Sequence, residues 1–477
     1  MGHSGRRLCR YDTICVMRPV ALGIFVLSMA AAARAQGSAA PDPVVVSGEH
    51  PRLFLRASRL RLLRRERERH SARWQQFEAL VSGSAPMPEP GFAQALYHQV
   101  SGDRNAGRRA VAWALAASDL RQMALVYDWC QDVLETGERA QLMARIARRE
   151  SETAALESIA AVRSRVLAAV ALFDEEGADA GAPDPPREEL DRAVHTWWEG
   201  RLAPALAAGK AAVPREEAYA MMELLHALVD SARLDLRESA GAYFAGFPIE
   251  HLMGYYPAPY RMPEGDIYLG ATRHAGPPDI EAAVLSRAAE LAMVAFDVNS
   301  PSTQVLQGWL MHDRFQMRTA FGAPYEFLWA NPYQPGLSYY QVPLIYYDAR
   351  LGRLYVRSSW EDDAEWFGLF DGVMQLFHDG KVTPYGSQAA AEPLLLDTAA
   401  ICFASPDRRN SAAWQLRLDD EQAVFVVGLE PHRRYLVEVD DEEVLEGEAD
   451  PAGILEVDDF PHGRAAGLRM HAAGAPR

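Results

Sequence analysis

The chain has 477 residues, of which 49% are hydrophobic and 24% charged. This composition is ordinary for a globular protein, and the chain is long enough for two or three domains. Its formal net charge of −17 argues against non-specific nucleic-acid binding, and any anionic ligand needs a local group of Arg or Lys side chains. The sequence contains no phosphate-binding loop, G-x-S-x-G elbow, H-E-x-x-H motif or dinucleotide-binding fingerprint.

The N-terminus has the pattern of an export signal. Met17 and Arg18 precede an apolar run at residues 21–27, and an A-x-A cleavage pattern ends at Ala35. We expect residues 1–35 to be a signal peptide whose true start lies near Met17, with residues 1–16 an upstream misassignment. The apolar run is too short to span a bilayer. The sequence therefore predicts a periplasmic or secreted protein with no membrane span.

Two cysteines remain after removal of this segment. Cys130 lies in a helical pattern and Cys402 in a region of strands, so we predict that both are buried and that they do not pair. No cysteine or histidine spacing typical of a metal site occurs. We accordingly predict no metal and no cofactor.

Helical patterns follow a linker at residues 36–49. Apolar residues recur at helical spacing, with Gly, Pro and Asp dipeptides between the stretches. The predicted helices cover about 57–81, 91–100, 106–117, 120–134, 139–156, 160–174, 188–208, 214–232, 280–296 and 303–311. Consecutive helices with short connections are typical of an α-solenoid or a closed (α/α) toroid, here over residues 50–335.

The hydrophobic period changes near Trp329. Short stretches rich in β-branched and aromatic residues, separated by turn residues, predict strands. They lie at 344–347, 354–357, 366–370, 373–377, 422–428, 434–439, 443–447 and 453–457. Strands at this spacing favour a sandwich over residues 340–477. The predicted fold class is a multidomain α-then-β chain.

One segment between the helical patterns, Pro248–His274, carries most of the chemically active side chains. Its four prolines and three glycines exclude one uninterrupted helix. It holds phenols, imidazoles and guanidinium groups on an irregular backbone, and such segments are often functional. A surface loop whose aromatic rings pack on neighbouring helices fits the same residues.

Several short stretches resemble the heparinase II/III-like polysaccharide lyases. They are His50–Phe54, Ala124–Trp129, Val213–Tyr219, Tyr255–Pro257 and Arg357–Trp360. The resemblance implies an incomplete (α/α) toroid joined to an antiparallel β-sandwich. It also implies an exported enzyme that cleaves an acidic, uronate-containing polysaccharide or oligosaccharide by β-elimination. The chain departs from the family at the His-x-His-x-x-Asp-like motif, where only His378 is found.

β-Elimination from a uronate needs a cation to neutralise the carboxylate, a base for the neighbouring C–H proton and an acid for the leaving oxygen. We predict that Tyr256 or Tyr255 transfers the proton and that His251 and Arg261 assist, since nearby cations would be needed to lower a phenol pKa from about 10. The predicted substrate-binding residues are Glu217, Tyr219, Tyr260, Arg273, His274, Trp198 and His312. Trp198 also fits a helix core, and Glu217 also fits a first helical turn.

Two other functions remain open from the residues. The first is a non-catalytic relative that binds glycans. The second is a glycoside hydrolase that uses two carboxylates, with Glu217, Glu264 and Asp266 as candidates. A cationic cleft would favour the lyase, an aromatic cleft the binding protein, and two facing carboxylates the hydrolase. The sequence identifies neither the sugar nor the oligomeric state.

Overall fold

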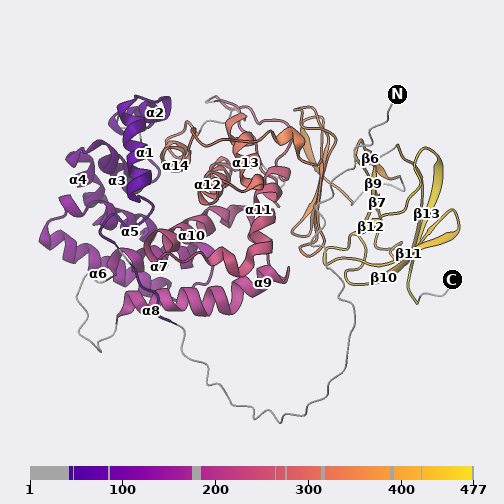
Figure 1. Ribbon diagram of the computed structural model, residues 1–477, viewed down its shortest axis with the longest axis horizontal. Coiled ribbons are helices and arrows are strands. Elements are labelled where there is room, and N and C mark those ends of the chain that lie inside the picture. The colour runs from indigo at the N-terminus through magenta and orange to yellow at the C-terminus, as the bar shows by residue number, and fades with distance from the viewer. Residues whose placement is uncertain are drawn as a thin grey trace, which may run out of the picture. The chain divides into compact units, whose positions relative to one another are not determined.

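The computed structural model describes residues 42–46, 48–83, 86–173, 184–263, 265–273, 277–312, 317–386, 392–419 and 422–474. The predicted signal peptide, Glu264 and His274 lie outside these residues. Residues Pro43–Arg477 belong to one compact unit, in which the described helices precede the described strands (Figure 1). The order of α-helical and β-structure predicted from the sequence is therefore confirmed.

The helical part begins at Ala57 and ends at Gln341. Its α-helices are α1 (Ala57–Glu68), α2 (Ala72–Ser82), α3 (Pro90–Ser101), α4 (Arg104–Ala114), α5 (Leu120–Trp129), α6 (Thr136–Thr153), α7 (Ile159–Leu172), α8 (Pro185–Asp191), α9 (Ala203–Ala207), α10 (Ala218–Ala232), α11 (Gly241–Met253), α12 (Ile280–Phe296), α13 (Pro301–His312) and α14 (Gly322–Trp329). Between them lie the short helices η1 (Gln131–Val133), η2 (Arg192–Leu202, a π-helix), η3 (Arg215–Glu217), η4 (Leu236–Ala240) and η5 (Tyr339–Gln341).

A closed cycle of contacts organises these helices. α3 packs on α5, α5 on α7, α7 on α10, α10 on α12, α12 on α14, and α14 returns to α3. Their buried residues are dominated by Ala, Leu and Val, which allow helices to approach closely on two sides. Two of the stretches that carry the family resemblance, His50–Phe54 and Ala124–Trp129, are in contact here. Asp128 accepts backbone N–H bonds from Arg52 (3.0 Å) and Leu53 (2.8 Å).

Several helix boundaries differ from the prediction for local reasons. The helix expected over 57–81 breaks at His70, whose φ is 50°, and Ser71 caps α2 by accepting a bond from the Trp74 N–H. The segment expected to be irregular from Pro248 begins instead as the last turns of α11, which contains Pro248. From Gly254 to Arg273 the described backbone is irregular, with isolated bridges at Tyr255–Gly270 and Tyr260–Ile267.

The strands form three sheets. Their bounds are β1 (Ile345–Asp348), β2 (Arg353–Arg357), β3 (Trp366–Phe370), β4 (Val373–His378), β5 (Lys381–Pro384), β6 (Leu394–Leu396), β7 (Ala399–Phe403), β8 (Ser411–Arg417), β9 (Ala423–Val427), β10 (Arg434–Val439), β11 (Glu442–Glu448), β12 (Leu455–Val457) and β13 (Ala465–Ala472). The sheet orders are β1-β2-β3-β4-β5, β12-β9-β7-β6 and β11-β10-β13-β8. The named strands pair antiparallel, as expected, except that β7 and β9 are parallel. β8 lies between them in sequence but in another sheet, and such a crossover permits parallel pairing.

Two apolar cores join the three sheets. Side chains of β2 and β3 pack against those of β6, β7 and β9, and the opposite face of β7 and β9 packs against β8, β10 and β13. Cys402 lies in the second of these cores and Cys130 in the helical core; both are buried free thiols, as predicted.

The first sheet also packs against the helical part. The helical core includes Tyr355 of β2, Trp366 and Phe370 of β3, and Phe377 of β4. The neighbours of Tyr355 in β2, Leu354 and Val356, face the sheet that contains β7 and β9. The indole N–H of Trp366 donates to the backbone oxygen of Met253 (2.9 Å). β2 is buried on both faces. On its helical side, Arg353 pairs with Glu250 of α11 and Arg357 donates to the backbone oxygen of Tyr255 (2.8 Å).

Candidate functional site

A polar pocket lies where the end of α11 and the segment after it meet β2 and β3. Its lining is Val213, Arg215, Glu216, Glu250, His251, Ala271, Thr272, Arg273, Arg353, Tyr355, Phe370 and Asp371. The free volume is about 20 Å³, which is room for a water molecule. We call this site the α11–β2 pocket. It brings together His251 and Arg273, two residues that the sequence predicted for the site.

His251 is held by a buried carboxylate behind the pocket. Its Nδ1 lies 3.3 Å from Oε1 of Glu290, a residue of α12 with no exposed surface. Burial lowers the pKa of His251 to about 4, and the charge of Arg215 acts in the same direction. The imidazole is therefore neutral at pH 7. Because an ionised carboxylate only accepts hydrogen bonds, Nδ1 carries the proton and Nε2 carries the lone pair.

Glu290 is the centre of this polar group. Oε1 also accepts a bond from Arg215 (2.9 Å), and Oε2 accepts one from the Tyr255 hydroxyl (2.6 Å). Burial alone would raise the pKa of Glu290, but the bond to His251 and the charge of Arg215 hold it below its ordinary value. Arg215 also lies 4.6 Å from the ring of Tyr255. The cation next to this phenol is therefore Arg215 of η3.

The arginines of the pocket differ in their freedom to bind an anion. Arg353 forms ion pairs with Glu250 and Asp371, and Arg215 pairs with Glu290. Arg273 is exposed and makes no ion pair with any residue that the structure describes. Among the described arginines of the pocket, Arg273 is therefore the one that could pair with a ligand carboxylate without breaking an ion pair to a described residue.

Tyr256 points away from this group and toward the sheet. Its hydroxyl donates to Oε1 of Gln375 in β4 (2.8 Å), and the amide of Gln375 donates to the backbone oxygen of Thr272 (2.8 Å). Burial raises the pKa of Tyr256 to about 12. Both phenols that the sequence predicted as proton-transfer groups are therefore buried and donate to protein oxygens.

Comparisons with known proteins add one distant similarity. No family model matches the chain, and no curated protein matches it. Among solved structures, the chain is similar to one titled "Glycoside hydrolase", with 10% sequence identity and a TM-score of 0.29. The alignment covers 90% of this chain and 77% of that chain. A similarity of this size assigns neither a fold family nor an activity.

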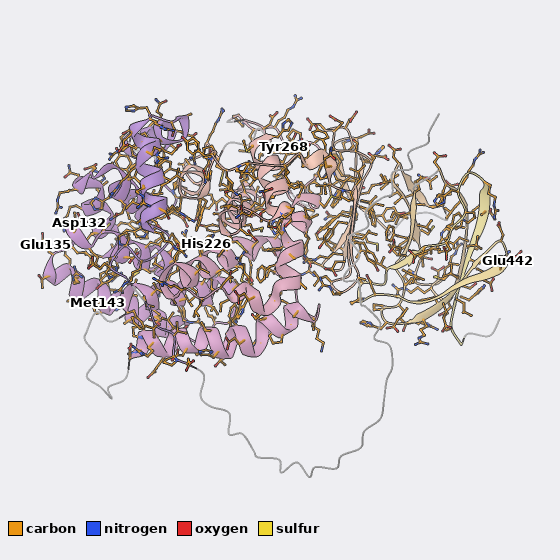
Figure 2. All side chains as sticks on the ribbon, in the orientation of Figure 1. Asp132, Glu135, Met143, His226, Tyr268 and Glu442 are labelled. Carbon is orange, nitrogen blue, oxygen red and sulfur yellow. The ribbon has the colours of Figure 1, made fainter. Side chains whose placement is uncertain are left out.

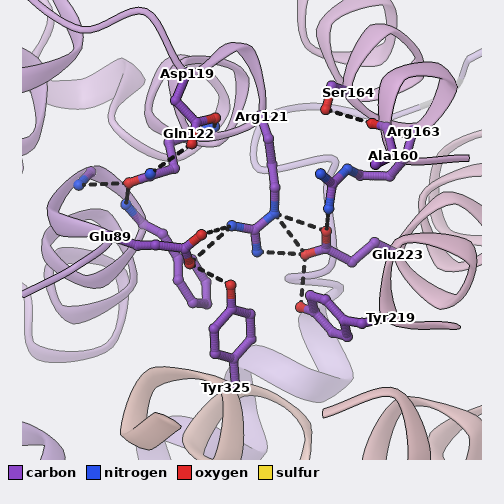
Figure 3. Close-up of polar contacts among 12 residues, drawn as sticks. Glu89, Asp119, Arg121, Gln122, Ala160, Arg163, Ser164, Tyr219, Glu223 and Tyr325 are labelled. Carbon is purple, nitrogen blue, oxygen red and sulfur yellow. Dashed lines mark hydrogen bonds and ion pairs between the residues drawn. The ribbon is translucent and has the colours of Figure 1, made fainter. Parts of the chain in front are cut away.

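Tyr219 lies in a different polar group, inside the cycle of helices. Its hydroxyl donates to Glu223 (2.7 Å), which also binds Arg121 and Arg163 (Figure 3). Arg121 reaches across to Glu89, which also accepts a bond from Tyr325. We call Glu89, Arg121, Arg163, Tyr219, Glu223 and Tyr325 the Arg121 cluster. Its two arginines and two glutamates balance in charge, and its members come from or flank α3, α5, α7, α10 and α14.

The remaining predicted binding residues are dispersed. Trp198 is buried in η2, where its indole donates to the backbone oxygen of Leu236 (3.0 Å), so it belongs to the helix core. Glu217 is half-buried, and burial together with the charge of Glu216 raises its pKa. Tyr260 and Arg261 are exposed.

His312 ends α13 beside an aromatic group. Its ring lies 5.5 Å from that of Tyr339, which stacks on Tyr340 at 4.6 Å. His226 lies among the helices (Figure 2), where its ring is 3.7 Å from that of Phe296 and Nε2 is 2.9 Å from the Ala292 backbone oxygen. It has the contacts of a core histidine.

Several residues in and behind the pocket were not predicted from the sequence. Glu250 in the pocket lining and Glu290 behind it each stand as a charged residue within an apolar stretch, which is the signal that could have identified them. Arg353 lies between Arg350 and Arg357 and carries no such signal. Tyr355 was assigned only to a strand. Among the described residues no group of three or more His, Cys, Asp or Glu side chains is arranged to hold a metal ion. Within the same residues, no helix has the length and apolarity needed to cross a membrane.

Proposed function

We propose that the protein is an exported polysaccharide lyase that cleaves a uronate-containing glycan by β-elimination in the α11–β2 pocket. One observation carries the proposal. The neutral imidazole of His251 lines the same pocket as the guanidinium group of Arg273, which makes no ion pair with a described residue. These are the two charge states that β-elimination requires of a base and of a carboxylate-neutralising group.

In this reaction Arg273 binds the uronate carboxylate, which makes the proton on the adjacent carbon more acidic. Nε2 of His251 takes that proton. Glu290 stabilises the imidazolium that forms, because its carboxylate already accepts the Nδ1–H bond. Tyr255 and Arg215 fix Glu290 in turn through their bonds to its two oxygens. His251 is the catalytic residue, and Glu290 is a positioning residue.

We also propose that the helical part is an (α/α) toroid and that residues 340–477 form the sandwich domain of such a lyase. The closed cycle of α3, α5, α7, α10, α12 and α14 supports the first point. The ion pair of Arg353 in β2 with Glu250 in α11 supports the second, because both residues line the pocket.

A glycan-binding protein without catalysis is the second candidate. It is favoured by the low exposure of His251 (3%) and Tyr355 (5%) and by the buried hydroxyls of Tyr255 and Tyr256. Under this function the pocket residues would support the fold of a binding surface.

One experiment separates these functions. Purified protein is incubated with a panel of uronate polysaccharides and with neutral glucans as controls. We expect absorbance of the unsaturated uronate product to rise with the uronates alone. New reducing ends without that absorbance would instead indicate hydrolysis. Retention on an immobilised glycan without either product would indicate the binding protein.

The pH dependence follows from the burial of His251. A base acts only in its neutral form, and the pKa of His251 in the folded protein is about 4, below the ordinary 6.5. We therefore expect kcat/KM to persist as the pH falls through 6.5 and to decline only near pH 4. Steady-state rates between pH 4 and pH 8 measure this. A decline centred near pH 6.5 would argue against His251 as the base.

A further inference from the structure

Tyr355 is a tyrosine of β2 that lines the α11–β2 pocket. It stands on β2, opposite Tyr346 of β1 in the antiparallel register, and its ring packs 5.8 Å from Trp366. Only 5% of the residue is exposed, yet it lines the pocket together with His251 and Arg273. The sandwich side of the site thus contributes a phenol where the sequence offered no histidine pair.

The hydroxyl of Tyr355 is available for a ligand. It forms no hydrogen bond with any residue that the structure describes, whereas the hydroxyls of Tyr255 and Tyr256 donate to Glu290 and Gln375. Burial raises the pKa of Tyr355, and the charges of Arg353 and Arg215 only partly offset this. The phenol therefore keeps its proton at neutral pH and can give it away.

We propose that Tyr355 is the proton donor to the leaving glycosidic oxygen, an assignment that rests on the lyase function proposed above. His251 takes the proton from the carbon next to the uronate carboxylate. The electron pair of that C–H bond forms the new C=C bond, and the bond from the neighbouring carbon to the glycosidic oxygen breaks. That oxygen receives the proton of the Tyr355 hydroxyl and leaves as an alcohol. Transfer of a proton from the imidazolium to the phenolate through solvent restores both groups, so no water is consumed.

This assignment divides the acid and the base between the two parts of the chain. The base comes from α11 and the acid from β2, and Arg273 of the same pocket provides the carboxylate site. Tyr255 and Tyr256, the phenols that the sequence predicted for proton transfer, then support the site through Glu290 and Gln375.

The test compares Tyr355→Phe with Tyr346→Phe in the full chain. The two tyrosines pair across neighbouring strands with ring centroids 6.1 Å apart, but only Tyr355 lines the pocket. On a natural uronate polysaccharide we expect Tyr355→Phe to lower kcat by about 10²–10⁴-fold with KM near that of the parent, as is typical for loss of a general acid. Tyr346→Phe should keep the parent's kcat.

A second substrate distinguishes proton donation from a structural role. In it, the uronate carries a dinitrophenoxy leaving group, which departs as an anion without protonation. Tyr355→Phe should then turn over at nearly the parent rate. Fluorotyrosine at position 355, being more acidic, should shift the basic limb of kcat to lower pH.

Three results would overturn the assignment. The first is parental kcat of Tyr355→Phe on the polysaccharide, and the second is an equal loss on both substrates. The third is a loss of kcat in Tyr255→Phe or Tyr256→Phe that exceeds the loss in Tyr355→Phe. A parent chain that degrades no uronate polysaccharide would overturn the lyase function itself and the assignment with it, and this outcome is distinct from the other three.

Discussion

His251→Gln should abolish most of the turnover while the protein stays folded. Glutamine is close in size and can still donate an amide N–H to Glu290, but it cannot accept a proton from carbon. General acid–base groups typically contribute about 10²–10⁴-fold in rate, so we expect kcat on the best uronate polysaccharide to fall by that factor. KM should change little, because Arg273 still binds the carboxylate. Steady-state kinetics of unsaturated-product formation measures both constants.

His226→Gln is the matched control. Both histidines are 3% exposed and both lie on helices of the same part of the chain, but His226 stacks on Phe296 outside the α11–β2 pocket. We expect this variant to keep the parent's kcat and to lose only stability. Equal kcat in His251→Gln and the parent would show that His251 is not the base. Equal losses in the two variants would point to a general loss of structure.

The architecture follows closely from local patterns. Amphipathic stretches of ten or more residues identify most helices of the ring, because burial of one face requires apolar residues at helical spacing. The hairpins β1–β2 and β3–β4 were predicted for the corresponding reason, with Asp371 and Gly372 supplying a turn in which both residues have positive φ. Strands such as β8 and β13 lack a local turn signal, because the paired residues Leu416 and Ala466 are 50 positions apart in the sequence.

The site was harder to predict because its bonds join residues far apart in sequence. The segment around His251 was identified from its composition, and the pocket does lie beside it. The residue that holds His251 is Glu290, 39 positions later, on a helix whose pattern indicates only burial. The distance between an apolar helix and a loop depends on the tertiary fold, so no periodicity in one sequence reports it. The place of Tyr355 in the pocket was not predicted, because an aromatic residue in a strand is expected from β-propensity alone.

The largest effect on stability should come from Glu223. This residue of α10 has no exposed surface and binds Arg121 and Arg163, which come from α5 and α7. Burial raises the pKa of Glu223, but the two guanidinium groups overcome this and hold it below its ordinary value, so the carboxylate is ionised. Glu223→Ala would leave the buried Arg121 with only the carboxylate of Glu89 and the half-buried Arg163 without the carboxylate it binds. Loss of one partner of a buried ion pair typically costs about 3–5 kcal/mol, and we expect a decrease of that size in the free energy of unfolding.

Urea unfolding followed by far-ultraviolet circular dichroism measures this decrease, with Glu152→Ala as the control. Glu152 pairs with Arg149 on the surface of α6, where 47% of its side chain is exposed, and such pairs are worth about 0–1 kcal/mol. Glu223→Gln keeps the shape and an acceptor for Tyr219 but removes the charge, so it should be destabilised nearly as much as Glu223→Ala. A double replacement of Arg121 and Glu223 by methionine should recover part of the loss, because it removes a charge on each side of the pair. If Glu223→Ala loses no more stability than Glu152→Ala, the Arg121 cluster does not hold the ring of helices together, and the apolar contacts of α5, α7 and α10 must suffice.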